Sequence, residues 1–157
     1  MIELLPRLQR FAYALTNSRA DGEDLLQATY LRAIENLDKW VVGSRLDSWM
    51  YKMAQNIHIN SMRHAAVKRR HLEKSAIEAG NVFDGVGAAI HQDELKKVAT
   101  SMSQLPGDQR AALLLVAVEG FGYAEAAKIL DVPIGTVTSR LARARQALSS
   151  SIYGQEA

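Results

Sequence analysis

The segment from Gly122 to Leu148 constrains the fold of this chain more than any other stretch of its sequence. Apolar residues recur at helical spacing from Ala126 to Leu130, and the Asp-Val-Pro triplet at residues 131–133 then interrupts the run. A second helix is expected from about Gly135, and its apolar residues at i, i+4, i+7 and i+11 form one inward face: Val137, Leu141, Ala144 and Leu148. Two short helices joined by a tight turn are typical of a helix-turn-helix that reads DNA.

The opposite face of that second helix is cationic. Three arginines and no acid lie between Ile134 and Leu148, which suits contacts to phosphates and to guanine edges. The polar residues of this face are Thr136, Ser139, Arg140 and Arg143. The alternative is a solvated helix pair in an all-α domain, with arginines that only keep it in solution.

The net charge of +2 is too small to indicate a nucleic-acid partner, but the charge is distributed unevenly. Residues 20–38 hold five acids and one arginine, a local charge of −4. Residues 39–74 hold eight bases and two acids, a local charge of +6. An acidic segment followed by a basic one indicates two different partners.

The absence of cysteine excludes disulfides, thiol nucleophiles and cysteine-ligated zinc. Glu3 and Pro6 stand where a charged leader before an apolar run would begin, and no stretch of about 18 apolar residues occurs. We therefore expect a cytoplasmic protein that does not insert into a membrane.

Catalytic and metal-binding patterns are missing from the sequence. Of four histidines, His64 and His71 fall on one helical face, but no HExxH pair or His-carboxylate cluster surrounds them. The Asp-Gly-Val-Gly run at residues 84–87 is too short for a phosphate loop, and neither GxxxxGK nor GxSxG occurs. The sequence predicts a protein that is not an enzyme and that holds no metal or cofactor.

The N-terminal part reads as three helices. Apolar residues form a stripe from Leu4 to Leu15, and a second helix is expected from about Ala20 to Leu37, with acids in its first turn. A Gly-Ser break at residues 43–44 precedes a third helix that runs from about Leu46 toward Arg70. The inward face of the second helix is predicted at Leu25, Leu26, Thr29, Ala33 and Leu37.

The chain changes character between residues 71 and 103. Glycines cluster between Gly80 and Gly87, and apolar periodicity is weak until Leu95, which indicates a mobile linker leading into another helix. A second compact unit then follows, with a strongly apolar helix from Arg110 to Val118. The predicted fold is all-α, with two small helical domains, residues 1–70 and 104–157, joined by a linker at 71–103; the C-terminal domain contains the helix-turn-helix.

Four motifs in this order resemble a known family. They are Asp21-Gly22-Glu23-Asp24-Leu25-Leu26-Gln27, WMYKMAQN at residues 49–56, Leu105-Pro106-Gly107-Asp108-Gln109-Arg110, and Ile134-Gly135-Thr136-Val137-Thr138-Ser139-Arg140-Leu141. Nearly the whole chain resembles a bacterial extracytoplasmic-function (ECF) sigma factor. The resemblance implies a transcription initiation factor that joins core RNA polymerase and places its two units on two promoter elements.

The resemblance implies that the first unit docks on the clamp helices of the largest polymerase subunit. The matching residues are Asp21, Glu23, Asp24, Gln27, Leu31 and Arg32, beside Leu26. Leu26 and Leu31 could each instead belong to the core. Ala28 departs from the family pattern, which usually has an acid at this position.

The same unit is implied to capture the minus-ten element by holding one flipped base between the loop at residues 40–45 and the third helix. Amides can pair with a base edge, an aromatic ring can stack on it, and cations can follow the melted strand. The matching residues are Trp40, Gly43, Ser44, Arg45, Tyr51, Lys52, Asn56, Asn60, Arg63, Arg69 and Arg70. Asn56 could instead satisfy buried backbone groups, and Trp49 and Met53 are expected in the core.

The second unit is implied to read the minus-thirty-five element through Thr136, Thr138, Ser139, Arg140 and Arg143. Arg140 could contact a base or a phosphate. Thr138 stands where a basic residue is frequent in the family, so the promoter preference stays open.

The implied partners are core RNA polymerase, promoter DNA and an anti-sigma factor, and the free chain is expected to be a monomer. One alternative is a sigma-like decoy that captures an anti-sigma factor, although a pure decoy need not keep Arg140 and Arg143. Another is a dimeric helix-turn-helix repressor, which leaves the acidic helix and the WMYKMAQN segment unexplained. An enzyme is disfavoured because catalytic groups are missing.

Overall fold

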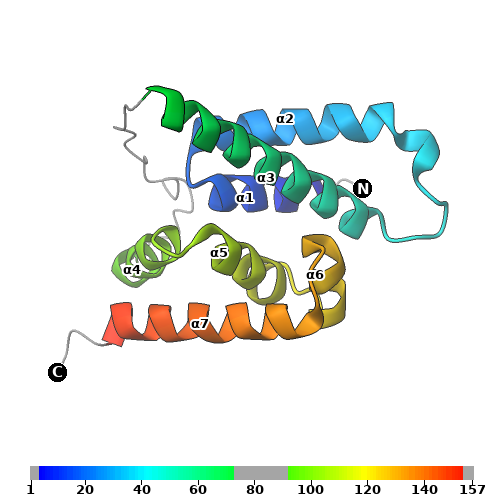
Figure 1. Cartoon of the computed structure of the whole chain (residues 1–157). Coiled ribbons are helices and arrows are strands. Elements are labelled where there is room, and N and C mark those ends of the chain that lie inside the picture. Colours follow the sequence, from blue (N-terminus) through cyan, green and yellow to red (C-terminus); the bar gives the residue numbers. More distant parts are fainter. Residues whose placement is uncertain (1–3, 73–91, 154–157) are drawn as a thin grey trace. The chain divides into compact units, whose positions relative to one another are not determined.

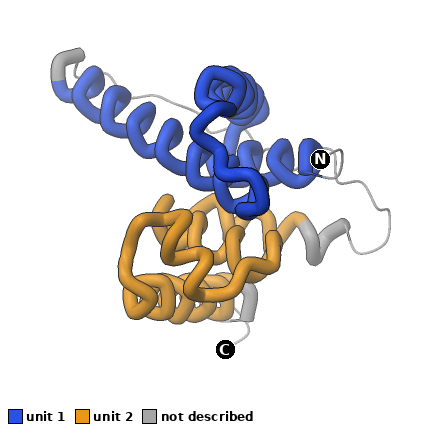
Figure 2. Tube along the Cα trace, turned by 90° about the vertical axis from the view of Figure 1, so that its right-hand side faces the viewer, with its two compact units in different colours: residues 1–80 blue, residues 81–157 orange. Residues whose placement is uncertain are grey.

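Every regular element that the structure describes is a helix, so the predicted all-α class is confirmed (Figure 1). The structure is a computed structural model that describes residues 4–72 and 92–153. The chain divides into two compact units, unit 1 at residues 1–80 and unit 2 at residues 81–157 (Figure 2). The glycine cluster of the expected linker lies outside the described residues.

The described part of unit 1 contains three α-helices that contact one another pairwise: α1 (Leu4–Thr16), α2 (Arg19–Glu35) and α3 (Leu46–Leu72) (Figure 1). The turn from α1 into α2 passes through Asn17 at a φ of 55°, a left-handed conformation that asparagine tolerates. Ser18 then caps α2, because its side chain accepts a hydrogen bond from the Asp21 backbone N–H at 3.2 Å. The buried residues of α1 are Leu4, Leu8, Phe11, Ala12, Ala14 and Leu15.

The two helices approach each other closely at Gly22. A Cβ atom built on this residue would lie 2.9 Å from the Cα of Tyr13, which belongs to the backbone of the facing helix. A glycine inside a helix costs roughly 0.5–1 kcal/mol relative to alanine. The close approach of α1 and α2 therefore explains why a glycine stands at this position.

The second helix ends earlier than the sequence predicts. Its last residue is Glu35, and a short 3-10 turn, η1 (Leu37–Lys39), follows. Leu37, predicted on the inward face, is 56% exposed in this turn, because the chain has left the helical path and its periodicity. The residues of that face that are buried as predicted are Leu25, Thr29 and Ala33.

The residues that α3 buries differ from those that the sequence predicts. Trp49 and Met53, expected in the core, are only half-buried. The Tyr51 ring instead meets the Phe11 ring edge-on, with centroids 4.9 Å apart and planes at 67°. The buried residues of this stretch are Met50, Tyr51, Ala54 and Gln55.

Unit 2 is arranged along one long helix, α7 (Ile134–Tyr153), which contacts α4 (Gln92–Ser103), α5 (Gly107–Leu113) and α6 (Tyr123–Leu130) (Figure 1). The fifth helix continues into a π-helical turn, η2 (Leu114–Val118). The fourth helix occupies the end of the segment assigned to a linker, so unit 2 includes the helix into which that linker was expected to lead. The predicted inward face of α7 is correct: Val137, Leu141 and Ala144 are at most 1% exposed, and Leu148 is half-buried.

The predicted turn between α6 and α7 is present. Asp131 adopts a left-handed conformation, with a φ of 57°, and the next N–H, of Val132, donates to the Ala127 carbonyl at 3.1 Å. The Pro133 carbonyl accepts hydrogen bonds from the N–H groups of Thr136 and Val137, in the first turn of α7, at 3.0 and 3.3 Å. Helices α6 and α7 thus form the helix-turn-helix.

Replacing Gly22 by alanine tests the close approach of α1 and α2. The added methyl group must move one helix away from the other, so we expect unit 1 to lose about 1–3 kcal/mol of stability. Both tryptophans of the chain, Trp40 and Trp49, belong to unit 1, so urea unfolding followed by tryptophan fluorescence reports on this unit. The control is Ser61→Ala, at an exposed position of α3 in the same unit. Equal midpoints for the two variants would contradict the packing.

Candidate docking surface and nucleic-acid interface

The second helix exposes the residues that the sequence predicts on a docking surface. Leu31 is 61% exposed and therefore does not belong to the core, whereas Leu26 is half-buried. Ile34, which the sequence analysis did not single out, is 71% exposed and lies one turn beyond Leu31. The exposed predicted residues are Asp21, Glu23, Asp24, Gln27, Leu31 and Arg32. Two large apolar side chains, on the same helix as the acids and two to three turns beyond them, form a surface suited to a protein partner.

Glu23 also takes part in contacts within unit 1. The Tyr13 hydroxyl donates to Glu23 Oε1 at 3.1 Å and accepts a hydrogen bond from Gln9 Nε2 at 3.0 Å. Arg19 adds an ion pair with the same carboxylate, at 3.7 Å. Glu23 therefore helps to join α1 and α2, a role that its place in an acidic motif did not reveal.

The third helix carries a polar stripe on its exposed side. Lys52, Asn56, Asn60 and Arg63 are spaced by three or four residues, which places them on one face of the helix, and all four are exposed. The exposure of Asn56 is inconsistent with the alternative that its amide satisfies buried backbone groups. Arg69 and Arg70 are also exposed, so cations continue along α3 beyond the amides.

The expectation for Tyr51 needs correction. Its side chain has no exposed surface, and its ring packs edge-on against Phe11. The Arg7 guanidinium lies over the same ring, 5.8 Å from the centroid. A ring in this place cannot stack on a base unless unit 1 repacks, so Tyr51 is a core residue of unit 1.

The loop at residues 40–45 forms a tight turn before α3. The Val41 carbonyl accepts hydrogen bonds from the backbone N–H of Ser44 at 3.0 Å and from its hydroxyl at 2.5 Å. Gly43 has a φ of 95°, which glycine adopts without strain. Val41 and Val42 are 69% and 86% exposed, so the turn presents apolar side chains to solvent. Gly43, Ser44 and Arg45 are exposed and Trp40 is half-buried.

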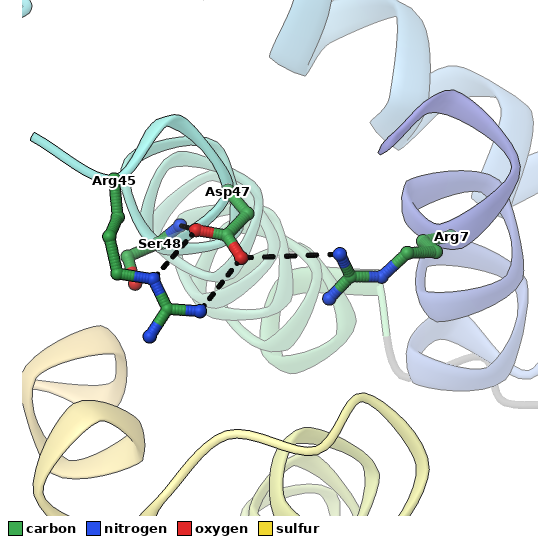
Figure 3. A network of polar contacts seen from close by, with 4 residues as sticks. All are labelled: Arg7, Arg45, Asp47 and Ser48. Carbon is green, nitrogen blue, oxygen red and sulfur yellow. Dashed lines mark hydrogen bonds and ion pairs between the residues drawn. The ribbon is translucent and has the colours of Figure 1, made fainter. Parts of the chain in front are cut away.

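Asp47 lies just beyond this loop, and two arginines reach it from opposite sides (Figure 3). Arg45 donates from Nε to Oδ1 at 3.2 Å and from Nη2 to Oδ2 at 2.9 Å. Arg7 of α1 forms an ion pair with Oδ2 at 4.0 Å. The backbone N–H of Ser48 donates to Oδ1 at 2.7 Å. Sequence patterns identify neither Asp47 nor Arg7, because α1 and the start of α3 meet only in the folded unit.

Two opposing effects set the pKa of Asp47. Partial burial raises it, and this effect is outweighed by the hydrogen bonds from Arg45 and Ser48 and by the charges of Arg45 and Arg7. The pKa of Asp47 therefore lies below its ordinary value, and the carboxylate is ionised at neutral pH.

The exposed face of α7 carries the predicted recognition residues in three different settings. The hydroxyls of Thr138 and Ser139 donate to the carbonyls of Ile134 and Gly135, at 3.2 and 3.0 Å, while both side chains stay exposed. Arg143 is exposed and Thr136 is half-buried. These residues follow the turn of the helix-turn-helix, where a recognition helix contacts base edges.

Arg140 is more constrained than its neighbours on α7. Its side chain is 23% exposed, and its Nε lies 3.6 Å from Oδ2 of Asp108, in the first turn of α5. The ion pair uses one edge of the guanidinium. An arginine whose guanidinium is held by an ion pair is better suited to a directional hydrogen bond with a partner than an arginine that moves freely.

Arg110 is a structural residue within a motif that the sequence analysis quoted. Its Nη1 donates to the carbonyls of Ser103 and Leu105, at 3.2 and 3.0 Å. These carbonyls lie at the end of α4 and in the turn that follows it, so Arg110 joins α4 to α5. Burial lowers the pKa of Arg110, but a guanidinium starts so far above neutral pH that it stays charged.

The described residues contain neither a metal-binding cluster nor a membrane-spanning helix. No three His, Cys, Asp or Glu side chains among them converge in a way that could hold a metal ion. None of the helices in residues 4–72 and 92–153 is long and apolar enough to cross a bilayer.

Family models match both units. The model of sigma-70 region 2 matches residues 1–67, and the model of sigma-70 region 4 matches residues 95–148. The chain is 32% identical to the ECF RNA polymerase sigma factor EcfG of Rhodopseudomonas palustris (strain TIE-1), over 98% of this chain and 83% of the relative. It is 31% identical to the ECF RNA polymerase sigma-E factor of Escherichia coli (strain K12), over 84% and 74% of the two chains.

Solved structures agree with this assignment. The sigma factor RpoE, crystallised with the anti-sigma factor NepR from Bartonella quintana, matches with a TM-score of 0.84 and 30% identity, over 96% of this chain and 92% of that one. The anti-anti-sigma factor PhyR of the same organism matches at 22% identity with a TM-score of 0.62, over 94% of this chain and 47% of PhyR, so that likeness concerns the fold alone.

Two helical units that match sigma-70 regions 2 and 4, the second of which carries a helix-turn-helix, define a transcription initiation factor of the sigma-70 class. The chain belongs to the ECF RNA polymerase sigma factors, as the resemblance in its sequence implies. Sigma factors are non-enzymatic initiation factors that bind core RNA polymerase and promoter DNA.

Replacing Arg110 by methionine tests its role in joining α4 to α5. Loss of two hydrogen bonds from a charged group should destabilise unit 2 by about 1–3 kcal/mol. Hydrogen exchange measured by mass spectrometry should show faster exchange in α4 and α5, while peptides of unit 1 stay unchanged. Arg145→Met, at an exposed position of α7, is the matched control. Wild-type protection of α4 in Arg110→Met would rule out this role.

Proposed function

We propose that unit 1 contacts core polymerase through α2 and captures the minus-ten element with α3 and the loop at residues 40–45, while unit 2 reads the minus-thirty-five element through α7. The observation that carries this proposal is the separation of surfaces: one helix of unit 1 exposes acids with leucine and isoleucine, and another exposes amides with cations. Acidic groups suit a protein surface and repel DNA, whereas amides and cations suit an opened strand.

The polymerase contact is assigned to the exposed residues of α2. Asp21, Asp24 and Gln27 lie on the same side of the first three turns, and Leu31 and Ile34 follow. Burial of two large apolar side chains would supply binding energy, and the acids would supply orientation. Arg32 and Glu23 also belong to the proposed contact. Glu23 has a second role, because its hydrogen bond from the Tyr13 hydroxyl joins α2 to α1.

The minus-ten contact is assigned to the polar stripe of α3. Asn56 and Asn60 can form hydrogen bonds with a base edge, and Lys52 and Arg63 flank them for phosphates. Arg69 and Arg70 extend the cationic track, and the loop residues Trp40, Gly43, Ser44 and Arg45 form the other wall. Tyr51 is left out, because its ring is buried.

The minus-thirty-five contact is assigned to the first turns of α7. Arg140, oriented by Asp108, is the residue that we assign to a base edge, and Arg143 is assigned to the phosphate backbone. Thr136, Thr138 and Ser139 complete the surface. Each unit binds a short element, so occupation of one raises the effective concentration of the other at its own element.

An anti-sigma factor is the proposed regulator, and the free chain is proposed to be a monomer. The RpoE structure that resembles this chain contains the anti-sigma factor NepR. A partner of this class could cover the exposed apolar side chains of α2. Capture of an anti-sigma factor without initiation is the second candidate function, because the RpoE structure contains NepR, and transcription assays separate the two functions.

Transcript mapping tests the proposed function. The purified chain is mixed with sigma-free bacterial core polymerase and genomic DNA from its source, and transcript 5′ ends are determined. We expect starts that depend on the chain and share two spaced upstream elements. A core that is active with another sigma factor but gives no starts with this chain would contradict the proposal.

Two substitutions separate the roles of the two units. Arg140→Ala should weaken binding of the upstream element by roughly tenfold or more, since a bidentate arginine–guanine pair contributes about 1–3 kcal/mol of discrimination. Asn56→Ala should impair promoter opening and spare polymerase binding. Run-off transcription, footprinting and a core-binding assay measure these effects. The controls are Arg145→Ala on α7 and Ser61→Ala on α3, both at exposed positions. Wild-type run-off transcription from either site variant would remove that residue from the site.

A further inference from the structure

The carboxylate of Asp47 is the meeting point of three separate parts of unit 1. Arg45 brings the end of the loop to it, Ser48 belongs to the first turn of α3, and Arg7 belongs to α1. The Asp47 side chain is only 20% exposed, whereas that of Arg45 is 56% exposed. Asp47 therefore lies behind Arg45, and Arg45 forms the solvent-facing part of the network (Figure 3).

The network continues into the core of unit 1. Arg7 lies over the Tyr51 ring, and that ring packs on Phe11. Arg45 is thus connected, through Asp47 and Arg7, to the contact between Tyr51 and Phe11 that orients α3 on α1. On the other side of Arg45, the loop is closed by the turn from Val41 to Ser44.

We propose that Asp47 is a positioning residue for promoter recognition: it holds the Arg45 guanidinium, and with it the end of the loop at residues 40–45, against the first turn of α3. Discrimination among bases at the minus-ten element then depends on this carboxylate, although Asp47 itself does not touch DNA. The proposal rests on the function assigned above to the loop and to α3.

Electrostatics alone predicts the opposite effect of removing this charge. An acid near a DNA-binding surface repels phosphates, so Asp47→Asn would strengthen binding to every DNA sequence if charge were its only contribution. A positioning role predicts instead that opening becomes weaker at the correct promoter and less selective among its variants. The sign of the effect therefore separates the two explanations.

The test uses holoenzyme assembled from core polymerase and the full chain, on a promoter found by transcript mapping. Opening is measured by permanganate reactivity on that promoter and on its single-base variants across the minus-ten element. We expect Asp47→Asn to lower the ratio of opening on the parent promoter to that on the variants by about fivefold, as loss of a bidentate charged pair implies. Asp38→Asn removes an equal charge from an exposed acid of unit 1 that lies outside the network, and it should leave the ratio unchanged.

Arg45→Lys provides a second and independent variant. It keeps the positive charge of an exposed side chain but cannot form the two parallel hydrogen bonds. It should lower the ratio as Asp47→Asn does, and the double variant should be no worse than either single one. Core binding and the tryptophan unfolding midpoint verify that each variant is folded and still docks.

Three outcomes are informative. A reduced ratio in both single variants, without further loss in the double variant, supports the positioning role. An unchanged ratio, or stronger opening on all promoters after Asp47→Asn, overturns it. Absence of starts with the wild-type chain would instead refute the proposed function, and this inference with it.

Discussion

The edge-on contact between the rings of Phe11 and Tyr51 is the interaction on which the surfaces of unit 1 depend. Its centroid distance of 4.9 Å fixes which side of α3 faces α1. A helix turns by about 100° per residue, so Asn60, nine positions after Tyr51, lies on the side opposite the ring. Burial of one aromatic side chain therefore places the amides and cations of α3 in solvent. The Asp47 network adds a polar connection from the same contact to the loop.

In unit 2, one long helix, α7, decides which side chains are buried and which are exposed. The seventh helix buries Val137, Leu141 and Ala144 and so leaves the proposed recognition residues on its outer side. The other helices of the unit pack along it, and Arg110 joins two of them through backbone carbonyls. The ion pair of Arg140 with Asp108 shows that a residue of α5 also reaches the proposed recognition face. The orientation of that face thus depends on packing within the whole unit.

Sequence patterns predicted regular amphipathic features well and residues at the junctions of elements less well. The stripe of α1 and the inward face of α7 follow helical periodicity, because an apolar face must be buried wherever the partner lies. Leu37 and Tyr51 did not follow the prediction. Leu37 lies beyond the end of its helix, and Tyr51 is an amphipathic residue whose ring could face either way. Asp47, Arg7 and Gly22 acquire their roles only from a facing helix, which periodicity along one segment does not show.

The sequence by itself determined the helical class, the helix-turn-helix, the separation of acidic from basic segments and the family, because these depend on local spacing and on the order of motifs. The tertiary structure decided which of the predicted residues lie at the surface and which hold others in place. Tyr51 became core, Leu31 became surface, and Asp47 became the link between a loop and two helices. The physical reason is that burial and ion pairing depend on distances between segments that are remote along the chain, and packing sets those distances.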